Sequence, residues 1–298
     1  MPHLPLTAEE SAERLSGVAL ICGAALMFTL IDTSAKYAAA HLVPTLEIVW
    51  VRYALSLLFS AIVLRPWRHW SAYVTHRPWA QLIRAVLLLG STVFNFIAIQ
   101  HLQLAQTASI NFASPLLVTA AAGPILGEWA GPRRWAAVVV GFLGIIVIVQ
   151  PTPGTFQPVA LFSVASSACY AGYALSTRLL SATESAGSLL IYGSLPSVLF
   201  LTPTVPAVAV LPPTWIVAGT LVLMGLVAGL GHWFLILASR RAPATVLAPF
   251  TYTQVLWMVA SGYLVFGDLP GLSTLAGAVI VIGSGLYLLY RERVHRDS

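Results

Sequence analysis

Asp32, Lys36 and Arg52 are charged side chains that lie within the first two long apolar runs of this sequence. Charge is costly among apolar residues unless it is paired or used, so these positions are the first candidates for chemistry. Asp32 and Lys36 are four residues apart, which puts them on one face of a helix in the favourable acid-first order. Asp32 could therefore pair with Lys36 or Arg52, meet a substrate amine or a proton, or lie near a surface.

Amide and aromatic side chains form a second set of candidates. Flat apolar area combined with single hydrogen-bonding groups suits an amphipathic small molecule. The same residue types also serve helix packing, and Trp or Tyr near helix ends often marks a membrane interface. The substrate-binding candidates are Asn95, Asn111, Tyr170, Tyr173, His232, Trp233, Tyr252, Gln254 and Trp257.

The motifs of common catalytic classes are missing. The sequence has no GxxxxGK[ST] segment for ATP, and neither HExxH nor GxSxG occurs. Cys22 and Cys169 lie in apolar runs without a CxxC pair, and His232 has no second His or Cys at zinc-ligand spacing. We therefore expect no catalytic residue, no metal site and no cofactor.

The composition indicates that these residues are positioned by membrane helices. Of 298 residues, 58% are apolar and 8% are charged, and the mean hydropathy is +0.85. A soluble domain carries about a quarter charged residues, so a soluble enzyme, a disordered protein and a disulfide scaffold are excluded. The formal net charge is +5, but the positions of the charges favour membrane orientation over nucleic-acid binding.

The expected fold is an all-α polytopic membrane protein with ten transmembrane helices. A spanning helix needs about 20 apolar residues, and ten continuous runs approach that length. The runs lie at about 17–38, 46–64, 79–101, 104–127, 132–150, 157–180, 187–206, 213–238, 242–267 and 271–290.

Basic residues set the expected orientation. If the N-terminus is cytoplasmic, 13 of the 15 Lys and Arg residues fall in cytoplasmic segments, and Lys36 and Arg52 are the remaining two. The outside connections 102–103, 151–156, 207–212 and 268–270 contain neither Lys nor Arg. This positive-inside pattern predicts that both termini are cytoplasmic.

The two halves of the chain resemble each other. Gly127-Glu128-Trp129-Ala130-Gly131 is echoed 140 residues later by Gly267-Asp268-Leu269-Pro270-Gly271. Because five helices is an odd number, duplicated five-helix units would be inverted, as in many secondary transporters, although similar composition alone could also produce the echo. Glu128 and Asp268 could each cap a helix or form a gate. The expected parts are tails at 1–16 and 291–298 and repeats at 17–150 and 157–290.

These features resemble the EamA-type branch of the drug/metabolite transporter superfamily, in particular the YddG kind of bacterial aromatic-amino-acid and metabolite exporter. The motifs that carry the resemblance are Arg52, Pro115 … Gly127-Glu128, Arg133-Arg134-Trp135, Ala242-Pro243 and Tyr252-Thr253-Gln254 … Phe266-Gly267-Asp268. The resemblance implies ten helices in two inverted repeats around a central cavity, and residence in the bacterial inner membrane. Asp268 departs from the Glu that is more usual in the family, and Pro249 could supply the kink that Pro115 supplies in the first half.

The expected function is a secondary transporter that exports small metabolites, amino acids including aromatic and neutral ones, by alternating access. The alternatives are a passive facilitator for small amphipathic solutes, or a transporter of nucleosides or drugs. The expected partners are an amino-acid-like small molecule and the lipid bilayer, with no nucleic acid. The protein could act as a monomer.

Overall fold

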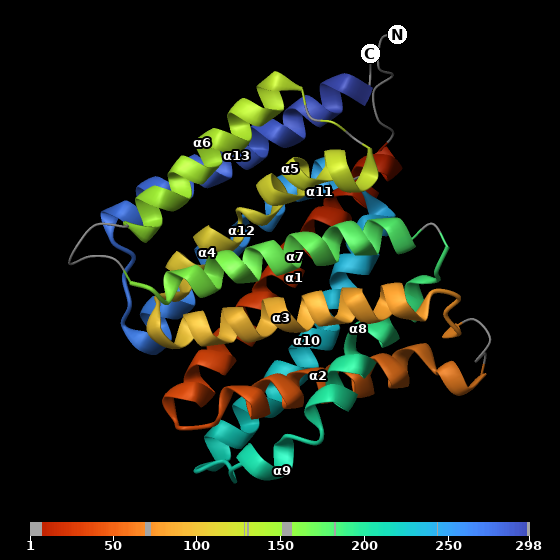
Figure 1. Cartoon of the computed structure of the whole chain (residues 1–298), viewed down its shortest axis with the longest axis vertical. Coiled ribbons are helices and arrows are strands. Elements are labelled where there is room, and N and C mark those ends of the chain that lie inside the picture. The colour runs from red at the N-terminus through yellow and green to blue at the C-terminus, as the bar shows by residue number, and fades with distance from the viewer. Residues whose placement is uncertain are drawn as a thin grey trace.

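The computed structural model describes residues 8–68, 73–127, 129, 131–150, 157–181, 183–242 and 244–296, and these residues form helices and short connections without a strand. In Figure 1 the helices lie roughly alongside one another, and α1 begins at the same end of the molecule at which α13 ends. The helices of the first half are α1 (Ala8–Ala40), α2 (Thr45–Leu64), the short 3-10 turn η1 (Pro66–Arg68), α3 (Pro78–His101), α4 (Leu104–Asn111), α5 (Ser114–Leu126) and α6 (Pro132–Val149).

The second half follows the same order of elements. It contains α7 (Ala160–Leu180), α8 (Ala186–Leu201), α9 (Val205–Val208), α10 (Trp215–Arg241), α11 (Ala244–Thr251), α12 (Thr253–Ser261), the π-helical turn η3 (Gly262–Phe266) and α13 (Leu272–Arg296). Within the described ranges, six helical stretches are long and apolar enough to cross a membrane: Ala12–Ala40, Thr45–Leu64, Pro78–His101, Leu104–Ile125, Pro132–Val149 and Trp215–Leu235. The shorter helices Ala186–Leu201 and Leu272–Leu288 are also apolar.

The ends of the chain are more helical than the polar sequence there suggests. We expected a tail before residue 17, whereas α1 already begins at Ala8. The segment from Ala8 to Leu15 is rich in Ala, Glu, Arg and Leu, all strong helix formers, so the helix extends beyond its apolar part. Likewise, α13 continues to Arg296, past the expected boundary at 290.

Two helix breaks occupy equivalent positions in the two halves. The helix formed by α4 and α5 is interrupted at Phe112, and the one formed by α11 and α12 is interrupted at Tyr252, 140 residues later (252 minus 112). In the first half, Pro115 lies in the first turn of the resumed helix, where its missing N–H costs nothing. In the second half, Pro249 lies inside α11 and precedes the break by three residues.

The repeated glycines also have matching conformations. Gly127 and Gly267 end α5 and η3 with φ angles of 74° and 71°, in the left-handed region that glycine adopts without strain. The echo in the sequence therefore marks the same helix-ending geometry in both halves.

The two halves pack against each other through reciprocal pairs of helices. α1 packs along α10, and α3 packs along α7, which pairs the first helix of each half with the third long helix of the other. The last helices of the two halves, α6 and α13, pack against each other along one side of the molecule (Figure 1).

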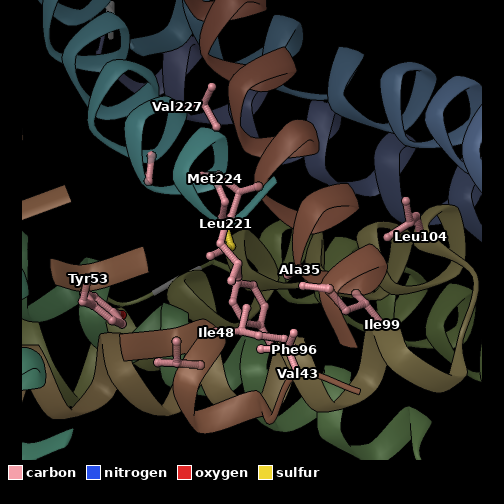
Figure 2. Packing of buried hydrophobic residues seen from close by; sticks show 14 of the residues in the cluster. Ala35, Val43, Ile48, Tyr53, Phe96, Ile99, Leu104, Leu221, Met224 and Val227 are labelled. Atoms are coloured by element: carbon pink, nitrogen blue, oxygen red, sulfur yellow. The ribbon is translucent and has the colours of Figure 1, made fainter. Parts of the chain in front are cut away.

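The largest apolar core joins α1, α2, α3 and α10. Leu221 and Met224 of α10 lie in one buried cluster with Ile48 of α2 and Phe96 of α3 (Figure 2). Close contact between α10 and α2 continues at Gly229, where an added Cβ would overlap the ring of Phe59. Small residues that let helix backbones approach are typical of membrane-helix interfaces.

Candidate functional site

A central cavity of about 400 Å³ lies between the two halves of the chain. Its wall is formed by residues of α1, α2, α3, α4, α5, α7, α10, α11 and α12. The predicted residues that line it are Asp32, Arg52, Asn95, Asn111, Tyr170, Tyr173, His232 and Gln254. On α1 (Ala8–Ala40) the lining runs from Ile21 to Asp32, across the middle of the helix.

A chain of hydrogen bonds leads across the cavity wall to Asp32. Asn95 Nδ2 donates to Asp32 Oδ1 at 2.9 Å, and Asn111 Nδ2 donates to Asn95 Oδ1 at 2.7 Å. Ser167 Oγ lies 3.2 Å from Asn111 Oδ1 and donates to it. The chain connects α7, α4, α3 and α1, and each amide donates toward the carboxylate, which can only accept when it is ionised.

Arg52 reaches the same cavity from α2. Its Nη1 donates to Thr92 Oγ1 at 3.0 Å, and its guanidinium lies 4.8 Å from the ring centroid of Tyr53. The Tyr53 hydroxyl in turn lies 2.8 Å from Thr92 Oγ1. These contacts hold the guanidinium in place but leave part of its hydrogen-bonding capacity unused.

His232 is oriented by its own helix. Its Nδ1 lies 2.8 Å from the carbonyl oxygen of Ala228, and because a carbonyl only accepts, Nδ1 must carry a proton. The imidazole also makes an edge contact with Phe28, with ring centroids 5.3 Å apart. These contacts fix the ring, and Nε2 is the nitrogen that a ligand could use.

Three predicted site residues do not line the cavity: Trp233, Tyr252 and Trp257. Tyr252 packs its ring against Phe112, with centroids 4.8 Å apart, and its hydroxyl fills the space next to the Cα of Gly285 on α13. Trp257 is 40% exposed on the outer surface of the helix assembly. On the same helix, α12, Gln254 and Met258 line the cavity, whereas Trp257 does not.

Lys36 does not pair with Asp32, which corrects one expectation. Lys36 Nζ forms an ion pair with Asp268 Oδ2 at 2.8 Å and donates to the carbonyl oxygen of Leu102 at 3.0 Å. The ammonium also lies 4.8 Å from the ring centroid of Phe266. Asp268 lies beyond the end of η3, so this contact joins α1 of the first half to the last part of the second half.

Two neutral contacts accompany this ion pair. Thr33 Oγ1 lies 3.1 Å from Ser261 Oγ, and Gln103 Nε2 donates to the carbonyl oxygen of Leu269 at 3.0 Å. Together these contacts close the cavity beyond Asp32 on α1. Glu128, the counterpart of Asp268 in the first half, lies outside the described residues.

A buried polar cluster behind the cavity was not among the predicted sites. Arg84 is 1% exposed, and it donates to Gln81 Oε1 at 3.1 Å and to the carbonyl oxygen of Leu189. Its guanidinium lies 5.4 Å from the ring centroid of Tyr173, which lines the cavity. From the sequence, Arg84 was predicted only to be one of the cytoplasmic charges; its position three residues after Gln81 in an apolar run was the available signal.

Glu184, between α7 and α8, anchors the end of this cluster. It accepts hydrogen bonds from Thr75 Oγ1 at 2.8 Å, from the backbone N–H of His76 at 3.1 Å and from Ser188 Oγ at 3.1 Å. Burial raises the pKa of Glu184, but these hydrogen bonds and one from the backbone of Arg77 outweigh burial. The net result is a pKa below its ordinary value of 4.5, so the group is ionised at neutral pH.

The sequence profile of the EamA-like transporter family matches this chain twice, at residues 15–150 and 157–291. The chain belongs to the EamA-like transporter family. The two matches cover both halves around the cavity, so the duplication seen in the helix breaks corresponds to two copies of the family's unit.

Named transporters resemble the chain over nearly its whole length. The S-adenosylmethionine uptake transporter of Rickettsia prowazekii is 26% identical over 95% of this chain and 96% of its own length. The riboflavin transporter of Rhizobium johnstonii is 26% identical over 96% and 94%. The pseudopaline exporter CntI of Pseudomonas aeruginosa is 28% identical over 90% and 93%.

The fold is also found in a solved crystal structure. That protein superposes with a TM-score of 0.65 at 15% sequence identity, over 94% of this chain and 98% of that one. At this identity the likeness concerns the fold alone.

Proposed function

We propose that this protein is a secondary transporter of the bacterial inner membrane, with ten transmembrane helices in two inverted repeats at 17–150 and 157–290. The equivalent helix breaks at Phe112 and Tyr252 and the matching glycines support the repeat. The exchanged packing of α1 with α10 and of α3 with α7 supports a two-fold relation between the halves. The distribution of Lys and Arg supports cytoplasmic termini.

The observation that carries the proposal is a central cavity between the halves with an ion pair beyond one end. The α1 residues of the lining, Ile21 to Asp32, all precede Lys36, whose ion pair with Asp268 joins the halves beyond the cavity. With cytoplasmic termini, the end that this pair bridges is the outer one, and we propose an inward-open state with Asp268 in an outer gate. Transport then requires the outer contacts to break while the inner end closes, as alternating access demands.

The proposed substrate is a small amphipathic metabolite, with neutral and aromatic amino acids as the first class to test. Asn95, Asn111 and Gln254 offer amide groups, and Tyr170 and Tyr173 offer flat apolar area beside them. The named relatives move S-adenosylmethionine, riboflavin or pseudopaline, in the direction of uptake in one case and export in another. We propose export, as a working direction.

Flux in proteoliposomes tests the function. The purified protein is reconstituted and offered labelled amino acids, S-adenosylmethionine, riboflavin and a nucleoside, with and without a pH gradient. Saturable flux that changes with the pH gradient supports coupled transport. Saturable flux that is the same with and without every imposed ion gradient indicates a facilitator. Absence of flux for every solute contradicts the proposal.

The membrane topology is tested separately. Leu42 and Leu211 are 87% and 93% exposed in connections assigned to the outside, so single cysteines there should react with an impermeant reagent added to intact cells. The background is a chain with Cys22 and Cys169 replaced by Ser. Labelling of either position only from the cytoplasmic side contradicts the ten-helix topology.

A further inference from the structure

The central cavity is lined by one carboxylate and one guanidinium that are not in direct contact with each other. Asp32 on α1 and Arg52 on α2 both line it, yet no oxygen of Asp32 lies within 4.0 Å of a nitrogen of Arg52. Lys36, the other cation near Asp32 in sequence, is held by Asp268. Both charges therefore face a cavity wide enough for a ligand without a partner of opposite charge in direct contact.

Arg52 presents an unused binding edge. One nitrogen, Nη1, donates to Thr92, and Nε is buried without a partner among the described residues, so neither is fully available to a ligand. Nη2 donates to no described residue and is not among the enclosed atoms, so it is the nitrogen open to the cavity. The two Nη groups of a guanidinium form a fork that binds both oxygens of a carboxylate, with Nη1 contributing the N–H that Thr92 does not use.

Asp32 presents the complementary group. The hydrogen-bond chain that begins at Ser167 ends on Oδ1, and Oδ2 accepts no hydrogen bond from any described residue. Asn95 holds the carboxylate from one side, so the second oxygen remains available to a donor in the cavity. An ammonium group, with three N–H donors and a positive charge, satisfies that oxygen best.

We infer that Asp32 and Arg52 are the two charge-selective groups of this cavity, and that they bind the ammonium and the carboxylate of one zwitterionic substrate. A zwitterion compensates both buried charges at once, whereas a simple amine or acid leaves one of them uncompensated, which is costly in a low-dielectric site. The tyrosines at 170 and 173 then lie where the substrate's side chain is accommodated. The inference rests on the proposed function and specifies the substrate class of the same site.

Binding of three phenyl ligands to the purified full-length protein tests the inference. Phenylalanine carries both charges, phenethylamine carries only the ammonium, and 3-phenylpropanoate carries only the carboxylate. By calorimetry in detergent, phenylalanine should bind at least about tenfold more tightly than either of the other two, as expected if each charged contact contributes more than about 1.4 kcal/mol.

Single substitutions should separate the two groups. Asp32→Asn should weaken the binding of phenylalanine and phenethylamine by about tenfold and leave the binding of 3-phenylpropanoate unchanged. Arg52→Gln should weaken the binding of phenylalanine and 3-phenylpropanoate by about tenfold and leave that of phenethylamine unchanged. Arg52→Lys keeps the charge but loses the fork, so it should fall between Arg52→Gln and the wild type. Arg68→Gln, at an exposed arginine outside the cavity, is the control and should change none of the three.

The outcomes also distinguish this inference from the proposed function. Thermal unfolding shows whether each variant is folded. If Arg52→Gln does not fold, Arg52→Lys is used in its place. Equal weakening of all three ligands by both substitutions, or no binding of phenylalanine, methionine or alanine at millimolar concentration, overturns the inference. If riboflavin still moves across proteoliposomes in that case, the transport function stands, whereas absence of flux for every solute contradicts that function itself.

Discussion

Phe112 and Tyr252 occupy equivalent positions in the two halves of the chain, and their ring centroids lie 4.8 Å apart. Each residue marks the point at which a helix of its half is interrupted. The two breaks therefore meet at the middle of the molecule, beside the cavity that Phe112 lines. Interrupted helices that meet at the interface of two repeats are the usual setting of a transporter binding site.

The ion pair between Lys36 and Asp268 should control the outer end of the cavity. Replacing Lys36 with Gln removes about 1 kcal/mol of attraction at a partly exposed pair, which is about a fivefold change in the population of the closed state. Labelling of a cysteine at Ser261 from outside should rise by that factor. The charge-swapped double variant Lys36→Asp, Asp268→Lys should return labelling toward the wild-type level. If neither single variant changes the labelling and the double variant does not restore it, the ion pair is not a gate.

Asn95 should be important for stability as well as for the site. Asn95→Leu keeps much of the volume but leaves Asp32 Oδ1 and Asn111 Nδ2 without partners. The expected loss is about 1–3 kcal/mol of unfolding free energy, measured as a lower Tm in detergent. Thr119→Val, which removes a hydroxyl bonded only to its own helix, should lower the Tm less.

Gly229 should tolerate no side chain. A Cβ there would overlap Phe59, so Gly229→Ala should force α10 away from α2 and destabilise the protein by about 1–3 kcal/mol. Gly219 lies on the same helix with no atom within 4 Å of an added Cβ, so Gly219→Ala should be neutral or slightly stabilising. Equal effects of the two substitutions on Tm would show that helix propensity, not the contact with Phe59, decides the result.

Glu184 should make stability depend on acid pH. Its pKa in the folded protein is lowered, so its contribution is present above its ordinary value of 4.5 and is lost as the pH falls through the folded value. Glu184→Gln replaces hydrogen bonds to a charged group with weaker ones, so it should lower the Tm at neutral pH. Solvent screening near the surface limits the expected loss to about 1 kcal/mol of unfolding free energy. The difference between variant and wild type should shrink below pH 4.5; a difference that is constant with pH excludes this role.

Tyr170 and Tyr252 should differ in their effects on substrate choice. Tyr170 lines the cavity, so Tyr170→Ala should reduce flux of aromatic substrates more than that of alanine, because lost stacking amounts to about 0.5–1.5 kcal/mol. Tyr252 packs against Phe112 and α13, so Tyr252→Ala should reduce flux of all substrates alike through lower stability. The opposite pattern would place Tyr252 in contact with substrate.

The sequence was sufficient to predict which segments are helical and where the halves repeat, because both follow from the length and spacing of apolar runs. Asn95 and Asn111 could also be predicted to point inward, since a buried amide needs a partner outside its own helix. The structure adds that these two amides partner each other and Asp32.

Pairings between distant segments could not be predicted in this way. Lys36 and Asp268 are separated by 232 residues, and helix periodicity says nothing about which of two carboxylates an ammonium will reach. The sequence also did not show that Trp233 and Trp257 lie outside the cavity lining, because both are close in the chain to residues that line it and an apolar run does not show which face of a helix turns inward. Arg84 could be seen only as a cytoplasmic charge, and Glu184 was not singled out, since the partners of both come from segments distant in the sequence.

Only one link of the hydrogen-bond chain to Asp32 crosses the seam between the two halves: the contact of Ser167 with Asn111. The Ser167 hydroxyl also lies 2.9 Å from the carbonyl oxygen of Ser163 on its own helix. When the halves separate there, the hydroxyl turns to that carbonyl and no buried donor is stranded. Separation at this one point therefore exchanges one hydrogen bond of Ser167 for another, while Asn95 and Asn111, which hold the carboxylate, remain bonded to each other within the first half.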